Sequence, residues 1–135
     1  MTAAFLRVIP LGGLGEVGKN MTVFEHQGAS LVVDAGLAFP RDEHLGVDLV
    51  LPDFSYLRDR PPGELRAVVL THAHEDHVGA LPYLMREVQV PEVWATRLTL
   101  GLVKSKLDEH GLLRAAELRE IDPEGDPLQL GPFRL

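Results

Sequence analysis

The stretch that decides the fold is Arg-Ala-Val-Val-Leu-Thr-His-Ala-His-Glu-Asp-His, which occupies residues 66–77. Its first half, residues 66–71, is a nearly continuous apolar run, as expected of a strand buried on both faces of a sheet. Its second half places three histidines and two acidic residues within the six positions 72–77. The polar cluster therefore begins where the strand ends, on a short turn at a sheet edge, and such a turn can surround a cation.

The spacing of the clustered side chains predicts two metal ions. His72 and His74 can point to the same side of the turn, while Asp76 and His77 can face a neighbouring position. Neutral imidazole and carboxylate suit zinc, and also manganese or iron. Two ions that share a water lower its pKa and stabilise charge on a phosphoryl or carbonyl oxygen. Asp76 and His77 are thus candidate catalytic residues, with Asp76 as ligand and candidate proton acceptor, whereas Glu75 has no assigned role.

The alternative for the cluster is a polar surface loop, or hydrogen-bonded histidines at a strand end. A single histidine would favour that interpretation, which we adopt for the isolated His26, His44 and His110. Five ligand-type side chains directly after a buried strand favour a metal site instead.

Length and composition limit the class of protein. A chain of 135 residues with 45% hydrophobic and 24% charged residues predicts one soluble globular domain, or part of one. Because cysteine is absent, histidine and carboxylate are the available metal ligands. The net charge of −7 argues against a broadly basic surface, but carboxylates around a metal pair are anionic until cations bind, so a nuclease is not excluded. Neither a signal peptide nor a membrane-spanning run of roughly 18 apolar residues is recognisable, which favours a cytoplasmic location without a membrane partner.

The remaining patterns predict a mixed α/β sandwich. Strands are expected at residues 6–10, 20–26, 30–34, 90–95 and 128–135, and helices at 81–88 and 96–110. Residues 38–63 contain four prolines and many acids, and we expect them to form a long, irregular connection of the kind that is usually functional.

A glycine-rich segment, residues 12–20, follows the first expected strand. Gly13 to Gly18 match the dinucleotide-binding fingerprint, and Lys19 completes most of a phosphate loop. Both nucleotide sites need a helix directly after the loop, whereas strand-type residues 21–24 follow, and Asn20 replaces the magnesium-binding Ser or Thr. The segment is therefore expected to be a turn, either with backbone amides exposed near a substrate or purely structural.

Together these motifs resemble a known family. Residues 72–77 are similar to the signature of the metallo-β-lactamase superfamily, and Asp34 in Val-Asp-Ala-Gly resembles its earlier motif. More narrowly, four segments resemble the ribonuclease J family of the β-CASP group: 9–21, 39–40, 45–48 and 81–84. The resemblance covers residues 5 to about 130.

The resemblance implies that residues 1–135 are the N-terminal part of a metallo-β-lactamase-like αββα sandwich. It implies that His72 and His74 bind one ion, that Asp76 and His77 bind the other, and that Asp34 orients the ligands from behind them. The family's later histidines, its bridging aspartate and its β-CASP and C-terminal domains do not lie within this chain. The chain is thus expected to be the first portion of a larger enzyme.

The implied activity is hydrolysis of RNA with two zinc or manganese ions. Such enzymes act as 5′-to-3′ exonucleases on 5′-monophosphate ends and as endonucleases, in RNA maturation, including that of rRNA, and in RNA decay. The full-length protein is expected to be a cytoplasmic homo-oligomer, a dimer. The resemblance also implies a structural cation such as calcium at Asp48 and the Val50 carbonyl, with solvated loop acids as the alternative.

Two other functions stay open at the level of sequence. A thioesterase or lactonase of the same fold would share the histidine cluster, but not the glycine-rich segment. A chain that acts only as an inactive folding or assembly module would need neither.

Overall fold

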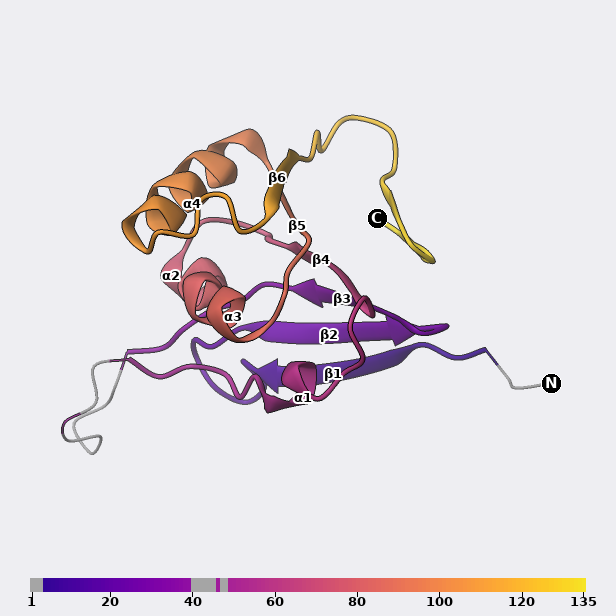
Figure 1. Ribbon diagram of the computed structural model, residues 1–135, viewed down its shortest axis with the longest axis horizontal. Helices are drawn as coiled ribbons and strands as arrows, with labels where there is room; N and C mark the ends of the chain where they lie inside the picture. Colours follow the sequence, from indigo (N-terminus) through magenta and orange to yellow (C-terminus); the bar gives the residue numbers. More distant parts are fainter. Residues whose placement is uncertain (1–3, 40–45, 47–48) are drawn as a thin grey trace.

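The fold is built on a six-stranded sheet with helices along one side, shown in Figure 1; the computed structural model describes residues 4–39, 46 and 49–135. The strands of the sheet are β1 (Arg7–Gly12), β2 (Met21–His26), β3 (Ala29–Val33), β4 (Leu65–Val69), β5 (Glu92–Ala95) and β6 (Glu117–Glu120), in that spatial order. β1, β2 and β3 are antiparallel neighbours, and β3 to β6 are parallel. The parallel strands therefore end at one edge, where ligand sites of α/β sheets commonly lie.

The helices occupy the connections between the parallel strands. They are α1 (Ser55–Arg58), α2 (Glu75–Val78), α3 (Leu81–Glu87) and α4 (Arg97–Glu109). Pro82 lies in the first turn of α3, where its missing N–H costs no helical hydrogen bond. In the described part of the chain, none of these helices has the length and apolar character needed to cross a bilayer.

A row of valines forms the centre of the main core. Val23, Val32, Val68 and Val93 are paired in register across β2 to β5, and each is fully buried. Leucines of α3 and α4 belong to the same cluster. Burying one such side chain stabilises the fold by about 1.5–3 kcal/mol. The row of valines therefore stabilises the register in which β2 to β5 are paired.

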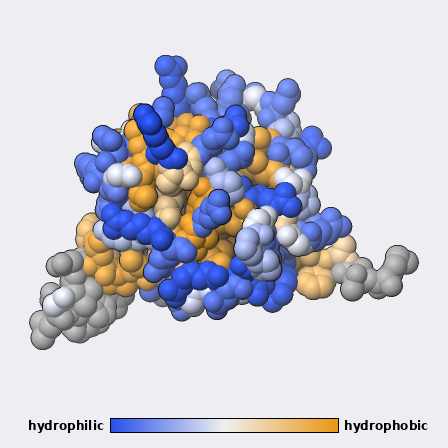
Figure 2. Space-filling view, viewed as in Figure 1, coloured by the Kyte–Doolittle hydropathy of each residue, from blue (hydrophilic) through white to orange (hydrophobic). Residues whose placement is uncertain are grey.

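The opposite face of the sheet carries a smaller cluster. Leu31, Ala67 and Val69 are covered there by Leu130, which lies in a hairpin of β7 (Gln129–Leu130) and β8 (Phe133–Arg134). Outside the cores, hydrophobic surface appears among charged side chains in the region of α4 (Figure 2), where Leu98 and Leu102 are exposed.

The predicted mixed α/β class is confirmed, and both predicted helices and the strands predicted at 6–10, 20–26, 30–34, 66–71 and 90–95 are present with slightly different ends. The single strand expected at 128–135 is wrong: the structure has a hairpin of β7 and β8 there, because the chain reverses its direction at Gly131, where φ is +56°. The structure adds β6, α1 and α2, which the sequence patterns did not predict. The expectation of an irregular connection at 38–63 is wrong in part, because α1 and a bridge between Ala38 and Val50 lie within it. Prolines end helices but do not prevent a single helical turn between them.

Candidate metal centre

The candidate metal centre lies where two parallel strands end side by side. β3 and β4 are paired up to Val33 and Val69, and Asp34 continues this pairing by donating its N–H to the Val69 carbonyl (2.9 Å). Thr71 and His72 follow β4 at the same edge. The sheet register therefore brings Asp34 next to a segment that lies almost 40 residues further along the chain.

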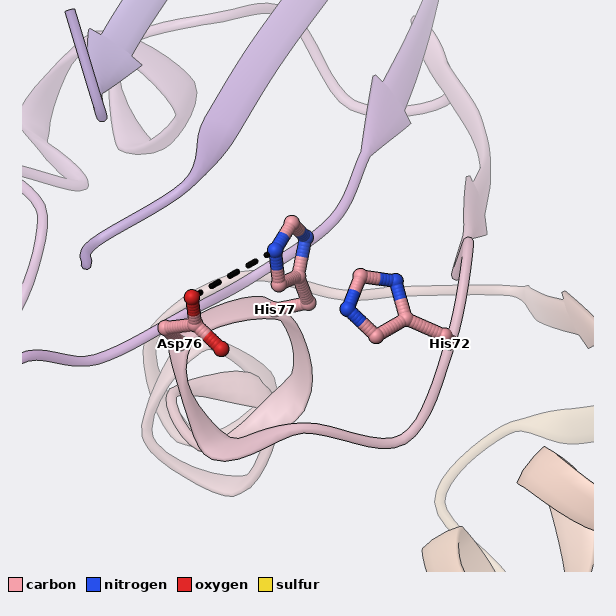
Figure 3. Close-up of side chains that lie close together, drawn as sticks. All are labelled: His72, Asp76 and His77. Atoms are coloured by element: carbon pink, nitrogen blue, oxygen red, sulfur yellow. Dashed lines mark ion pairs between the residues drawn. The ribbon is translucent and has the colours of Figure 1, made fainter. Parts of the chain in front are cut away.

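Three predicted ligands converge on one point. His72, Asp76 and His77 each offer a ligand atom within 4.8 Å of the others, and all three are half-buried. In Figure 3 the ring of His77 lies between the carboxylate of Asp76 and the ring of His72. His77 Nε2 is 3.5 Å from Asp76 Oδ2, and the two imidazole centroids are 3.9 Å apart. Two imidazoles and one carboxylate form a donor set that suits a divalent transition metal.

His74, the fourth predicted ligand, lies outside this group of three. It is exposed at the residue that precedes α2, and its ring stands edge-on to His72 with centroids 4.7 Å apart. The structure thus places His74 beside His72 and outside the group of three, and its metal role stays a prediction.

Asp34 is buried behind the histidines, with 5% of its surface exposed. Its carboxylate accepts hydrogen bonds from the backbone N–H of Thr71 (2.8 Å), from the Thr71 hydroxyl (2.9 Å) and from His77 Nδ1 (2.7 Å). A carboxylate only accepts, so His77 carries its proton on Nδ1. The lone pair of His77 Nε2 is left free for a metal, as the outer-shell position predicted for Asp34 requires.

Thr71 is a functional candidate that sequence reasoning missed. Its hydroxyl proton is donated to Asp34, and its Oγ1 lies 3.0 Å from His72 Nδ1. With that proton already donated, Oγ1 accepts from His72 Nδ1–H, so His72 also offers Nε2. The available signal was its position, directly between the buried strand and the first histidine.

The turn that carries the predicted ligands, residues 72–77, is called the ligand turn, and it is held from behind by residues 35–37. The carbonyl groups of Glu75 and His77 accept hydrogen bonds from the N–H groups of Leu37 (3.0 Å) and Ala35 (2.8 Å). Between them Gly36 passes so close to the turn that a Cβ there would overlap the Asp76 carbonyl. Residues 35–37, which follow Asp34 in the Val-Asp-Ala-Gly motif, therefore support the ligand turn through backbone hydrogen bonds and close packing.

Glu75 is not part of the group of three ligands. Its carboxylate accepts a hydrogen bond from Lys106 Nζ of α4 at 2.6 Å. This contact gives Glu75, which had no predicted role, a structural one: it joins α2 to α4.

The glycine-rich segment borders the centre. With Asp34 and His77 it lines a pocket of about 210 Å³, and β2 rather than a helix follows it at Met21. The two nucleotide-binding alternatives therefore lack the helix N-terminus they require.

The predicted structural cation stays a prediction. Asp48 lies outside the described residues, and the Val50 carbonyl accepts a hydrogen bond from Ala38 N–H at 2.9 Å.

Comparisons with known proteins identify a family and relatives for this chain. A family model of the metallo-beta-lactamase superfamily matches residues 14–129. Ribonuclease J of Helicobacter pylori is 45% identical over 96% of this chain, and ribonuclease J of Thermus thermophilus is 46% identical over 95%. The chain spans 19% and 23% of those two relatives. Among solved structures, a protein of unknown function from Enterococcus faecalis superposes with a TM-score of 0.61 at 18% identity, over 96% of this chain and 36% of that one.

Proposed function

The chain belongs to the metallo-β-lactamase superfamily, and from that premise we propose that it is the N-terminal part of a metal-dependent ribonuclease. The observation that carries the proposal is the convergence of His72, Asp76 and His77, whose ligand atoms lie within 4.8 Å of one another. The identity to ribonuclease J relatives over nearly the whole chain supports RNA as the substrate, rather than another ester.

In the proposed centre, His72 and His74 hold one ion, and Asp76 and His77 hold the other. Zinc or manganese held there would supply an activated water and would neutralise charge on a phosphoryl oxygen. Asp34 and Thr71 hold the imidazole rings of His77 and His72 so that Nε2 of each ring is available to a metal. Asp76 is the candidate proton acceptor. Because these groups are fixed before substrate binds, little reorganisation is needed during the reaction.

The finer activity that we propose is 5′-to-3′ exonuclease cleavage from 5′-monophosphate ends, with endonuclease cleavage as a second mode. It would serve maturation of RNA, including rRNA, and RNA decay, in a cytoplasmic dimer. These proposals rest on the family resemblance. They concern the complete protein, because the chain spans only about a fifth of the length of its relatives.

The test uses the complete protein with RNA labelled at either end and carrying a 5′-monophosphate, a 5′-triphosphate or a 5′-hydroxyl. Mononucleotides released in order from the monophosphate substrate are expected, together with some internal cuts. Chelation should abolish both activities, and added Mn²⁺ or Zn²⁺ should restore them. His77→Ala is expected to lower cleavage at least about 100-fold, because metal sites lose 10–100-fold from outer-shell changes alone. His110→Ala, outside the centre, is the matched control.

Intact RNA together with hydrolysis of a generic thioester or lactone would assign the small-molecule activity instead. A complete protein that binds no metal and cleaves neither class would leave only the folding or assembly role.

A further inference from the structure

The glycine-rich segment between β1 and β2 is closed by its own polar contacts. The Glu16 carboxylate accepts a hydrogen bond from Gly13 N–H at 3.1 Å and pairs with Lys19 Nζ at 3.4 Å. Lys19 N–H in turn donates to the Leu37 carbonyl at 3.1 Å. The segment therefore folds back toward residues 35–37, which lie behind the ligand turn. It does not form an open loop that could surround a phosphate.

Asn20, the only asparagine of the chain, comes directly after this segment and contacts the ligand turn. Its backbone N–H and its side-chain Nδ2 both donate to the Asp76 carbonyl, at 3.1 and 3.0 Å. In a longer helix that carbonyl would accept from Ala80, but Ala80 N–H donates to Ala35 instead, at 2.8 Å. Asn20 thus satisfies a carbonyl that the four-residue helix α2 leaves unpaired.

The neighbours of the Asn20 amide fix which way it faces. Nδ2 lies 3.4 Å from His77 Nε2, the nitrogen that offers a lone pair. The Asp76 carbonyl oxygen only accepts hydrogen bonds, so the NH₂ group of Asn20 faces it and Oδ1 faces away. Oδ1 lies against Gly13, where an added Cβ would come within 2.6 Å of it and where φ is +83°. A side chain at position 13 would displace the amide.

From these contacts we propose that Asn20 is a positioning residue for the metal centre. The Asn20 amide packs against Gly13 and donates a hydrogen bond to the peptide between Asp76 and His77. This bond fixes the orientation of that peptide, and so the direction of both ligand side chains. The proposal rests on the proposed function in taking Asp76 and His77 as metal ligands. It also gives the glycine-rich motif a task, which is to place one amide against the ligand turn.

The test compares Asn20→Ala and Asn20→Leu with wild type in the complete protein. Leu has the branched shape and the number of side-chain heavy atoms of Asn and is somewhat bulkier, but it donates no hydrogen bond. The backbone bond from residue 20 survives both changes, so the fold is expected to persist. Metal-free protein is titrated with Mn²⁺ alone, by calorimetry. Both variants should keep the wild-type stoichiometry and lose about 10–100-fold in affinity, the usual effect of removing an outer-shell partner. Gln89→Ala, a change at an exposed amide, should match wild type.

RNA cleavage adds a second measurement. If Asn20 acts through the ligands, excess Mn²⁺ restores the kcat of both variants, and KM for RNA is unchanged. Unchanged metal affinity, wild-type behaviour of Asn20→Leu, or a loss of kcat that excess metal does not restore would each overturn the proposal. If wild-type protein binds Mn²⁺ in the expected way but leaves RNA intact, the proposed function fails while the positioning role stands.

Discussion

At the scale of single residues, two hydrogen bonds decide which nitrogen each histidine offers. Asp34 accepts a hydrogen bond from His77 Nδ1–H, and the Thr71 hydroxyl oxygen accepts one from His72 Nδ1–H. Each ring is thereby held in one tautomer with Nε2 toward the cluster. Metal sites commonly use such outer-shell partners to orient their ligands.

Replacing Thr71 by Val should lower the affinity for Mn²⁺ or Zn²⁺ about 10–100-fold, because His72 loses the acceptor for its Nδ1 proton. Thr71→Ser keeps the hydroxyl and should stay close to wild type. Calorimetric titration of the metal-free complete protein measures both. Equal affinities for the Val and Ser variants would show that the hydroxyl does not orient His72.

Among the described glycines, Gly36 has the least room for a side chain. Gly36→Ala would drive a methyl group into the Asp76 carbonyl, so we expect a loss of stability of about 1–3 kcal/mol or more and loss of metal binding. Gly101→Ala is the matched control, since open space surrounds that position in α4. The control should gain about 0.5–1 kcal/mol from higher helix propensity. Urea unfolding measures both, and a neutral Gly36→Ala would contradict the close packing.

At the scale of elements, α2 is too short to be stable by itself, because one helical turn does not recover the cost of nucleation. Its carbonyl groups are instead paired with residues 20, 35 and 37, and its first residue is joined to α4 by the Glu75–Lys106 contact. The ligand turn is therefore a product of its neighbours.

Lys106→Met should remove the link between α2 and α4. Both charged groups are partly exposed, so the loss of stability should be small, about 0.2–1 kcal/mol, and high salt should diminish it. Urea unfolding at low and high salt is the measurement, with the exposed Lys104→Met as control. Identical behaviour of the two variants would mean that the contact contributes nothing in solution.

At the scale of the whole molecule, the edge opposite the metal centre holds a second polar network. Glu25, at the far end of β2, is buried with 7% of its surface exposed, and it accepts a hydrogen bond from the Tyr56 hydroxyl of α1. Arg7 and Arg60 lie 3.9 and 3.8 Å from the same carboxylate. This network joins α1 to β1 and β2, far from the ligands.

The network predicts an alkaline limit to stability. Burial raises the pKa of the Tyr56 phenol, and its hydrogen bond to Glu25 raises that pKa further. A folded-state pKa above the unfolded value favours the neutral phenol, so this contribution is complete below about pH 10 and is lost as the pH rises through the folded-state pKa. Tyr56→Phe should remove this decline in the free energy of unfolding. Parallel alkaline profiles for the variant and wild type would contradict the coupling.

The sequence by itself determined the α/β class, the strand that ends in the histidine cluster, and the resemblance to ribonuclease J that relatives at 45–46% identity confirm. Hydrophobic periodicity and short motifs depend on residues that are close together in the sequence, so they can be recognised without a structure. β6 was missed because this edge strand is mostly charged, and its pairing with β5 decides its form.

Only the tertiary structure decided the surroundings of the ligands. Asn20, Asp34 and Gly36 reach residues 71–77 from about 40 to 57 positions away, through the order and register of β2, β3 and β4. No local pattern encodes such contacts, because they arise when separate elements pack against one another. The same packing brings His72, Asp76 and His77 together and leaves His74 beside them, a distinction that sequence spacing alone does not make.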